Sequence, residues 1–297
     1  MRVGIIGLGR LGSIHFRIYK EIKNIEKIYL VDIDTEKLST DETCPHFTDY
    51  KQLKGLVDLV SIATPTTTHF KIAEFFLKNK IPVLVEKPLT QSLAEAEKLL
   101  EIAKKNKTIL FVGHVERYNS AYLAVKKSIK NPLFIECHRL SPYPYRSLDV
   151  SVVLDLMIHD LDIMLYFLKD KVKKLEAKGV KVLSKSHDIA NARLSFKNGC
   201  VANITASRIS AKTERKIRIF MPNCYISLDY AKQSVEIYRK IKSKITKESL
   251  SITKEEPLKK EIIDFVNSVK KAEFTIDDAN QAKDALSLAL QIQKAIS

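Results

Sequence analysis

Short apolar runs alternate with amphipathic stretches through the first third of the chain. The apolar runs are 2–6, 28–31, 57–63, 81–85 and 109–112. Runs without polar alternation are typical of parallel strands that are covered on both faces. The helices expected between them are 13–22, 50–56, 70–79 and 93–105. Strands that alternate with helices predict an α/β fold with a doubly wound parallel sheet.

Beyond residue 120 the pattern changes to shorter, alternating strands joined by turn signals such as Lys197-Asn198-Gly199. The expected strands are 134–140, 180–184, 190–196, 201–207, 216–221, 224–229 and 234–238, and the expected helices are 122–129, 152–168, 257–271 and 277–296. Neighbouring strands with tight turns pair as antiparallel hairpins. We therefore expect a first domain over 1–119. A second α+β domain over 120–297 should have an open, mainly antiparallel sheet of about six strands and C-terminal helices that pack back. The lysine-rich stretch 240–254 is expected to be a connection.

Composition narrows the class of protein only in part. Hydrophobic residues make up 45% and charged residues 29% of the 297 residues, as in globular proteins. No run is long enough to span a bilayer and the N-terminus begins with a strand, so we expect a cytoplasmic protein. The four cysteines show no CxxC spacing, and we expect no metal site.

The net charge of +15 raises the question of nucleic-acid binding. The lysines are spread along the chain, however, and the densest basic region, 215–247, mixes them with strand-like apolar residues. We therefore expect no nucleic-acid partner. A basic protein would also suit an anionic small substrate.

A glycine motif, Gly7-Leu8-Gly9-Arg10-Leu11-Gly12, stands between the first strand and the first helix. The first glycine allows a tight turn, the second lets the backbone approach a pyrophosphate, and the third allows close packing of helix and strand. Free N–H groups at the helix N-terminus then bind the anion. The motif predicts a dinucleotide site, and the alternative is an ordinary glycine turn.

Asp32 ends the second strand, twenty residues past Gly12, where an acid can bind the ribose hydroxyls of the adenosine. A carboxylate would repel a 2′-phosphate, so Asp32 favours NAD over NADP. Arg10 and Lys37 would reduce that repulsion.

Ligands of such sheets lie at the carboxyl ends of the strands. The cofactor-binding residues expected at this edge are Gly7, Gly9, Arg10, Leu11, Gly12, Asp32, Thr64, Pro65, His69, Glu86 and Lys87. Lys87 is also a catalytic candidate, because it ends a strand and is biased toward an extended conformation by Pro88. A lysine there can donate to a substrate oxygen or act as an acid or base. The alternative is a surface lysine.

Asp155 and His159 are spaced i, i+4 on an expected helix, so they share one face. The carboxylate could orient the imidazole or raise its pKa in a catalytic relay. A structural ion pair or cap is the alternative. Because the neighbours are apolar, we expect the pair to be buried.

Substrate-binding candidates lie where the second domain opens and in a strand-to-loop stretch with two prolines. They are Arg117, Tyr118, Asn119, Arg139 and Tyr145. The alternative for these residues is a solvated surface. The sequence contains neither a GxSxG nor an HExxH motif, which are typical of hydrolytic enzymes.

Together these motifs resemble the glucose-fructose oxidoreductase/inositol dehydrogenase (Gfo/Idh/MocA) family. The resemblance rests on the glycine motif, Ala63-Thr64-Pro65 with His69, Glu86-Lys87-Pro88, 113–119 and Asp155 with His159. It implies hydride transfer between NAD and a sugar or cyclitol carbon. It further implies that Lys87 contacts the reacting hydroxyl, Asp155 positions the substrate and His159 is the general base. The open sheet would form a dimer or tetramer interface.

The runs 153–160 and 113–119 are similar to the branch that oxidises UDP-N-acetylglucosamine at C3. In that branch a partner aminotransferase aminates the keto product for lipid A. Many members have glycines where this chain has Ser151 and Met157. The alternatives are a free-sugar or myo-inositol dehydrogenase and a catalytically silent NAD-binding regulator.

Overall fold

A computed structural model describes residues 1–38, 43–143 and 150–296. The chain forms two compact units, which are described separately. The first contains 1–114 and 258–283, and the second contains 115–257 and 284–297. Residues 115–119 thus belong to the second unit. The assignment of cofactor and substrate to separate domains stays a prediction.

The first unit is built on a six-stranded parallel sheet with the strand order β3-β2-β1-β4-β5-β6. Its strands are β1 (Arg2–Ile6), β2 (Lys27–Val31), β3 (His46–Phe47), β4 (Leu59–Ile62), β5 (Val83–Glu86) and β6 (Leu110–Gly113). The central strands β4, β5 and β6 are buried along their whole length. This order confirms the predicted doubly wound sheet.

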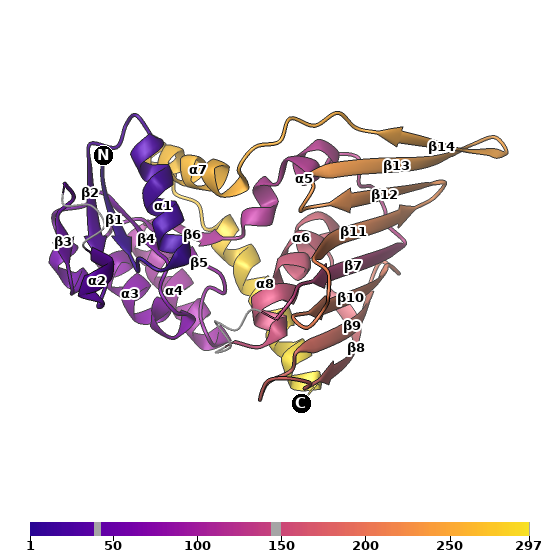
Figure 1. Cartoon of the computed structure of the whole chain (residues 1–297), viewed down its shortest axis with the longest axis horizontal. Coiled ribbons are helices and arrows are strands. Elements are labelled where there is room, and N and C mark those ends of the chain that lie inside the picture. Colours follow the sequence, from indigo (N-terminus) through magenta and orange to yellow (C-terminus); the bar gives the residue numbers. More distant parts are fainter. Residues whose placement is uncertain (39–42, 144–149, 297) are drawn as a thin grey trace. The chain divides into compact units, whose positions relative to one another are not determined.

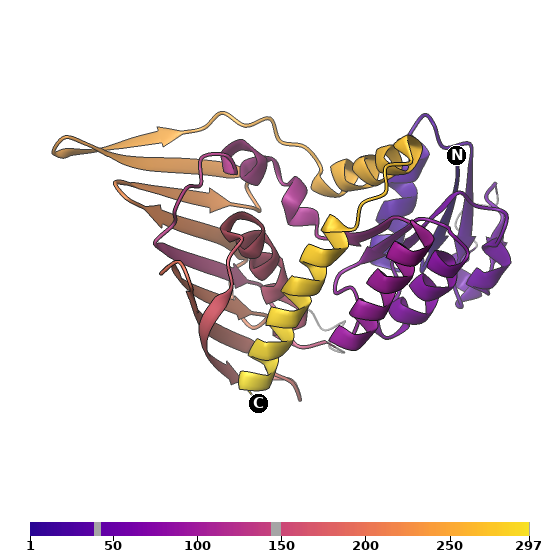
Figure 2. The same ribbon diagram turned by 180° about the vertical axis from the view of Figure 1, so that it is seen from behind.

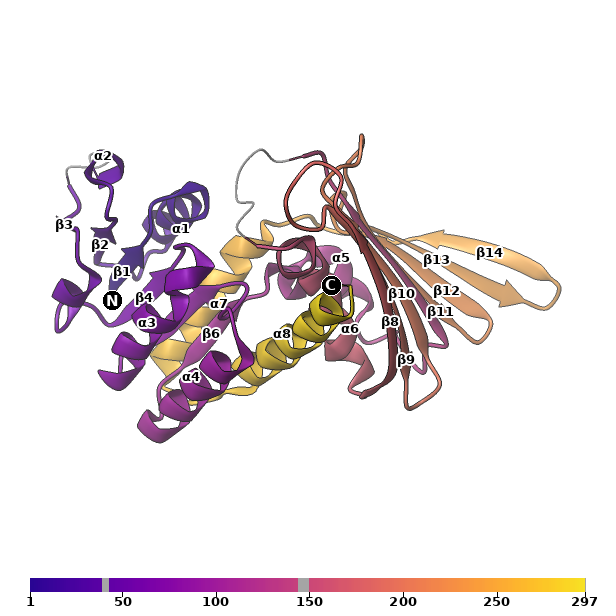
Figure 3. The same ribbon diagram turned by 90° about the horizontal axis from the view of Figure 1, so that it is seen from below.

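Helices cover both faces of this sheet. They are α1 (Arg10–Glu21), α2 (Thr35–Leu38), the 3₁₀ turn η1 (Tyr50–Leu53), α3 (Thr66–Lys78), α4 (Leu93–Asn106) and α7 (Pro257–Lys271). Helices α1 and α7 lie side by side on one face, where Lys259 pairs with Glu21, and α3 and α4 lie on the other (Figures 1 and 3). Coverage on both faces explains why these strands lack polar alternation.

The second unit contains an eight-stranded sheet with the order β14-β13-β12-β11-β7-β10-β9-β8. Its strands are β7 (Phe134–Leu140), β8 (Val172–Val180), β9 (Ile189–Phe196), β10 (Val201–Ser207), β11 (Glu214–Met221), β12 (Cys224–Asp229), β13 (Ser234–Ile241) and β14 (Lys244–Ser249). All neighbours are antiparallel except β7 and β10. The predicted open, mainly antiparallel sheet is confirmed, with eight strands where about six were expected.

Two segments of this sheet differ from the sequence-based expectation. The stretch expected as a connection contains β14, which pairs with β13 in a projecting hairpin (Figure 1). Of the expected strand 180–184, only Val180 lies in a strand, at the end of β8, and the chain then bends because Asp188 accepts hydrogen bonds from the backbone N–H groups of residues 182–184.

The two faces of the eight-stranded sheet have different surroundings. The helical elements of this unit are η2 (Val115–Tyr118), α5 (Ser120–Val125), η3 (Val153–Met157), α6 (Ile158–Leu168) and the later part of α8 (Asp277–Ala295). The inward positions of β7, Ile135, Cys137 and Arg139, are buried, whereas the alternate positions are only half-buried. Helices α5 and α6 and the end of α8 lie on the inner face, and no ribbon of the described chain covers the outer face (Figure 2). In the described ranges no helix is both long and apolar enough to span a membrane.

Candidate active site

The glycine loop joins β1 to α1. Gly7 has a φ of +88°, and a Cβ there would lie 2.8 Å from the carbonyl oxygen of Ala63. A Cβ on Gly12 would overlap the carbonyl oxygen of Gly7, so only glycine allows the helix to approach the strand so closely. Gly9, in contrast, has no atom within 4 Å of its Cβ position. The loop is therefore tightly packed at its two ends and open in the middle.

The N-terminus of α1 is suited to an anion. Gly9 provides no side-chain cap, and no acidic residue lies in the first turn. Arg10 and Leu11, both exposed, are the first residues of the helix. The free N–H groups and the dipole at this end favour a phosphate. The open cradle at Gly9 and the uncapped helix fit the pyrophosphate of a dinucleotide.

Asp32 follows β2 and is almost fully buried. Its Oδ2 accepts a hydrogen bond from the backbone N–H of Leu8 at 2.7 Å, and its Oδ1 accepts one from Asp34 at 2.9 Å. Each carboxylate oxygen can accept a further bond, which leaves capacity for ribose hydroxyls. Lys37 Nζ lies 3.8 Å from Asp32 Oδ1 and 3.2 Å from Asp34 Oδ2. The Asp32 carboxylate would thus repel a 2′-phosphate, whereas the nearby Lys37 ammonium would reduce that repulsion.

The sheet register brings the other expected cofactor residues of this unit to the same edge. Ile6 is aligned with Val31 and Ile62, and Glu86 is aligned with Gly113. Segments 7–12, 32, 64–65, 86–87 and 113–114 therefore all follow strands at one edge. The structure confirms this convergence within the first unit.

His69 connects two of these segments. Its Nδ1 lies 3.0 Å from the Pro88 carbonyl oxygen, and its Nε2 lies 2.9 Å from the Thr64 carbonyl oxygen. Burial lowers the pKa of His69, although the two carbonyl contacts oppose that effect. Pro65 precedes α3 as its N-cap residue. His69 holds the loop before α3 against the residues after β5.

A buried histidine that the sequence analysis missed supports Lys87. His15, on α1, is fully buried, with Nδ1 2.7 Å from Ser61 Oγ and Nε2 3.0 Å from Glu86 Oε1. Burial raises the pKa of Glu86, but the hydrogen bond and charge of His15, together with Lys87, lower it below its ordinary value. Glu86 Oε2 in turn accepts a hydrogen bond from the backbone N–H of Lys87 at 3.3 Å. Helix α1 is thus bonded to the strand end that carries Lys87.

The second unit positions Asp155 on a π-helical turn and His159 in the first turn of the helix that follows. Residues Val153–Met157 form the turn η3, and α6 begins at Ile158. Both side chains are half-buried, not buried as expected, and Val153, Leu154, Met157 and Ile158 around them are buried. A π turn has i→i+5 hydrogen bonds and is frequently found at functional sites. The buried neighbours anchor the turn while leaving the acid and the histidine accessible.

Several of the expected substrate residues take part in buried ion pairs. Arg139 donates through Nε to Asp160 Oδ2 at 2.9 Å and through Nη1 to Glu116 Oε1 at 3.0 Å. Burial lowers the pKa of Arg139, but the charges of Asp160 and Glu116 outweigh this effect and raise it. Asn119 donates to Glu116 Oε2 and to the Tyr230 carbonyl oxygen. These contacts hold β7 and η2 to the start of α6.

Arg117 makes a second ion pair with the same helix. Its Nε donates to Asp162 Oδ2 at 2.8 Å, and its guanidinium lies over the ring of Tyr166. Arg117 and Arg139 are both more than nine-tenths buried, whereas Tyr118 is half-buried. Tyr145 lies outside the described residues. Substrate binding by this group stays a prediction, and the two arginines already have a role in supporting α6.

Comparison with known proteins identifies the family. Residues 1–114 match the model of an oxidoreductase family with an NAD-binding Rossmann fold, Gfo/Idh/MocA. Residues 128–226 match the Gfo/Idh/MocA C-terminal domain. The chain belongs to the Gfo/Idh/MocA family. The predictions of the family, of an oxidoreductase and of a nicotinamide dinucleotide cofactor are confirmed.

Two relatives have names that bear on the substrate. The UDP-N-acetylglucosamine 3-dehydrogenase of Acidithiobacillus ferrooxidans is 32% identical, over 100% of this chain and 97% of that protein. Its solved structure matches with a TM-score of 0.92 over the same shares. The myo-inositol 2-dehydrogenase of Thermotoga maritima is 28% identical over 80% of this chain and 78% of that protein.

Proposed function

We propose that this enzyme uses NAD to oxidise the C3 hydroxyl of UDP-N-acetylglucosamine to the 3-keto sugar nucleotide. The observation that carries the proposal is the full-length similarity to the Acidithiobacillus ferrooxidans dehydrogenase, at 32% identity and a TM-score of 0.92. The net charge of +15 is compatible with a diphosphate substrate.

The proposed cofactor site consists of the glycine loop, the N-terminus of α1 and Asp32. Backbone N–H groups at α1 bind the pyrophosphate, and Asp32 accepts hydrogen bonds from the ribose hydroxyls. Bound NAD supplies the nicotinamide carbon that accepts a hydride. Asp32 favours NAD over NADP.

The proposed acid–base chemistry belongs to three side chains. His159 takes the proton of the C3 hydroxyl, and Asp155 orients the imidazole and positions the substrate. The Lys87 ammonium stabilises the negative charge that develops on the oxygen. The C3–H electron pair leaves as hydride, the C–O bond becomes a carbonyl, and the products are the ketone, NADH and a proton.

The outer face of the eight-stranded sheet supports a further part of the proposal, a homodimer or homotetramer. Four half-buried aromatic rings form a row across β7, β11, β12 and β13, with centroid distances of 5.7 Å, 5.1 Å and 4.4 Å. They are Phe134, Phe220, Tyr225 and Tyr238. An apolar row on an open face is typical of an interaction surface.

The keto product also has the chemistry that an aminotransferase consumes, which makes such an enzyme the proposed functional partner.

The decisive experiment follows NADH absorbance after the purified protein is mixed with NAD and UDP-N-acetylglucosamine. Glutamate and a 3-keto-sugar aminotransferase are added to draw the reaction forward, and NADP replaces NAD in a parallel assay. We expect substrate-dependent reduction with NAD and competition by UDP. No reduction with the sugar nucleotide, but reduction with myo-inositol, would favour the second candidate, which the Thermotoga maritima relative suggests. No turnover with any sugar would indicate a silent NAD-binding regulator.

Catalytic variants test the assigned roles. Lys87→Ala and His159→Ala should each lower kcat by about 10²–10⁴-fold, because each removes a group that acts on the reacting hydroxyl. NAD affinity, measured by titration, should be unchanged. Lys104→Ala and His46→Ala, at exposed positions, are the matched controls. Near-normal turnover of either catalytic variant would contradict the assignment.

A further inference from the structure

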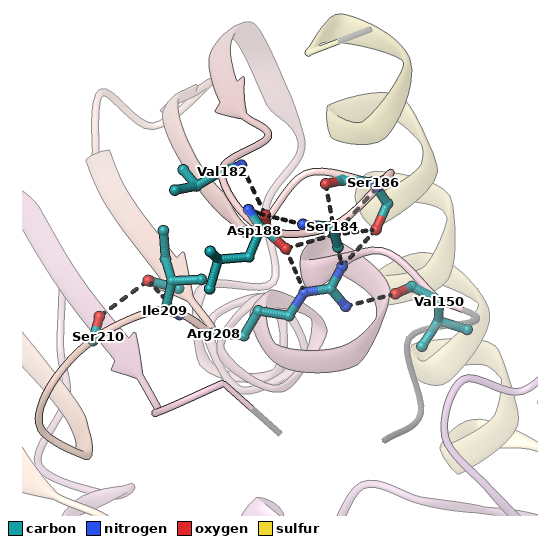
Figure 4. Close-up of polar contacts among 10 residues, drawn as sticks. Val150, Val182, Ser184, Ser186, Asp188, Arg208, Ile209 and Ser210 are labelled. Carbon is teal, nitrogen blue, oxygen red and sulfur yellow. Dashed lines mark hydrogen bonds and ion pairs between the residues drawn. The ribbon is translucent and has the colours of Figure 1, made fainter. Parts of the chain in front are cut away.

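A buried ion pair in the second unit has no part in the chemistry proposed so far. Arg208 follows β10 and is 1% exposed, and Asp188 precedes β9 and is fully buried. The Nε of Arg208 lies 3.2 Å from Asp188 Oδ1 (Figure 4). Burying two charges is costly unless good geometry and further hydrogen bonds compensate. The remaining contacts of the pair therefore indicate what it holds in place.

Each partner holds a different piece of chain. Asp188 Oδ2 accepts hydrogen bonds from three successive backbone N–H groups, residues 182–184, at 2.7–2.9 Å. The Nη2 of Arg208 donates to the hydroxyls of Ser184 and Ser186. The Nη1 points the other way and donates to the carbonyl oxygen of Val150 at 3.1 Å (Figure 4). Arg208 thus connects a fixed turn to the backbone at residue 150.

Val150 lies directly before the segment that carries Asp155 and His159. The next residue, Ser151, donates through Oγ to Gln293 Oε1 at 2.9 Å. The Ser151 carbonyl oxygen also accepts a hydrogen bond from the backbone N–H of Asp155 at 2.8 Å. Two consecutive residues at the start of the segment are therefore held by side chains from elsewhere in the unit.

The far end of the segment is held as firmly. Asp160 and Asp162 form the buried ion pairs with Arg139 and Arg117 described above. Between the two anchored ends lies the π turn, a backbone form that is rare and depends on its surroundings. A π turn fixed at one end only could relax into an α-helix, which would turn the side chains on it in a new direction.

We propose that Arg208 is a positioning residue for Asp155 and His159. It touches neither the substrate nor the cofactor but fixes residue 150, so that the π turn keeps the acid and the imidazole in their working orientation. The inference rests on the proposed function, because it concerns the side chains assigned to proton transfer. Asp188 completes the device by holding the guanidinium.

The test compares Arg208→Gln, Arg208→Lys and the control Arg193→Gln. Arg193 is exposed on β9, where its Nη1 donates to Asn203 Oδ1. Hydrogen exchange of the Asp155 amide requires no substrate, and Arg208→Gln should accelerate it by ~10-fold or more, while the amides of β11 and β12 keep their protection. The kcat should fall by ~10–100-fold with NAD affinity unchanged. Arg208→Lys keeps a buried cation but has a single nitrogen, so it should restore Tm more fully than the protection of the Asp155 amide.

The outcomes separate the inference from the proposed function. If the wild type does not oxidise the sugar nucleotide, the proposed function fails, and the exchange of the Asp155 amide still decides whether Arg208 fixes the turn. If Arg208→Gln lowers Tm but leaves kcat and the Asp155 amide like those of Arg193→Gln, the role is only structural and the inference is wrong. If Arg208→Gln does not fold, Ser186→Ala replaces it, because it removes one guanidinium contact without leaving a charge unpaired. It should accelerate exchange at Asp155 less strongly, and unchanged exchange would overturn the inference.

Discussion

Gly9 and Gly12 have different functions in the same loop. A Cβ on Gly12 would overlap the Gly7 carbonyl oxygen, whereas a Cβ on Gly9 would enter open space. The backbone of Gly9 has a φ of −66°, which any residue can adopt. Gly12 therefore serves packing, and Gly9 keeps a surface clear for the dinucleotide.

The two positions should respond differently to the same substitution. Gly12→Ala should lower the free energy of unfolding by about 1–3 kcal/mol, because the helix must move away from the strand. Gly9→Ala should leave Tm nearly unchanged but weaken NAD binding. Thermal unfolding and NAD titration of both variants check the prediction. Equal loss of stability would contradict the division of roles.

Asp188 should make the free energy of unfolding depend on pH in the acidic range. Burial raises the pKa of Asp188, but hydrogen bonds from Ser184 and from the backbone N–H groups of residues 182–184 outweigh it and hold the pKa well below 3.8. A lowered folded-state pKa means that the stabilisation is complete above the ordinary value and is lost as pH falls below it.

The stability difference between the wild type and Asp188→Asn should therefore shrink as the pH falls from about 6 to about 3. Urea unfolding at a series of pH values measures it. A difference that stays constant across this range would show that Asp188 has an ordinary pKa.

At the scale of elements, the contact between α1 and β5 depends on His15 and Glu86. Removing one partner leaves the other buried without compensation, whereas removing both leaves no uncompensated group. His15→Ala should lower the free energy of unfolding by about 3–5 kcal/mol. The double variant His15→Leu with Glu86→Leu should lose less. Denaturant unfolding of both proteins tests this order, and a double variant that is less stable than His15→Ala would reverse the interpretation.

Elements with a clear hydrophobic period could be predicted from sequence, and those without one could not. The strands β1, β2, β4, β5 and β6 contain continuous apolar runs and β7 alternates, so the sequence predicts them, whereas the two-residue strand β3 has no such pattern. Every residue of β14 is exposed, so its sequence has no buried side from which to recognise a strand. The π turn at 153–157 changes backbone hydrogen bonds without changing the apolar pattern, and it was expected as part of an ordinary helix.

At the scale of the whole molecule, the motif positions at one sheet edge were predictable because parallel strands place their carboxyl ends together. The partners of buried polar groups were not. His15 and Glu86 are 71 residues apart, and Arg139 and Asp160 are 21 apart. Only the packing of a helix on a sheet brings such pairs together, because His15 lies on α1 and Asp160 lies on α6. The sequence therefore does not show that the substrate candidate Arg139 has buried ion-pair partners, since these lie on other elements.

The aromatic row on the outer sheet face leads to a prediction about assembly. Tyr225 is central to the row, with ring centroids 5.1 Å from Phe220 and 4.4 Å from Tyr238. Tyr225→Glu should place a charge in the proposed interface and shift the protein to the monomer. Light scattering at several concentrations measures the mass. Lys105→Glu, at an exposed position of α4 in the first unit, is a suitable control. A wild type that is monomeric at all concentrations would remove this surface from the proposal.

The π turn also has a consequence for how this segment can change by insertion and deletion. A π turn holds one residue more than the α-helical turn that would occupy the same length of axis, and each residue of an α-helix rotates the chain by about 100°. Loss of Leu156 would let the turn close as an α-helix without disturbing α6. Asp155 would then be rotated away from its present direction, while His159 stayed where it is. Deletion of a single codon would thus abolish the proposed catalytic geometry in a protein that still folds.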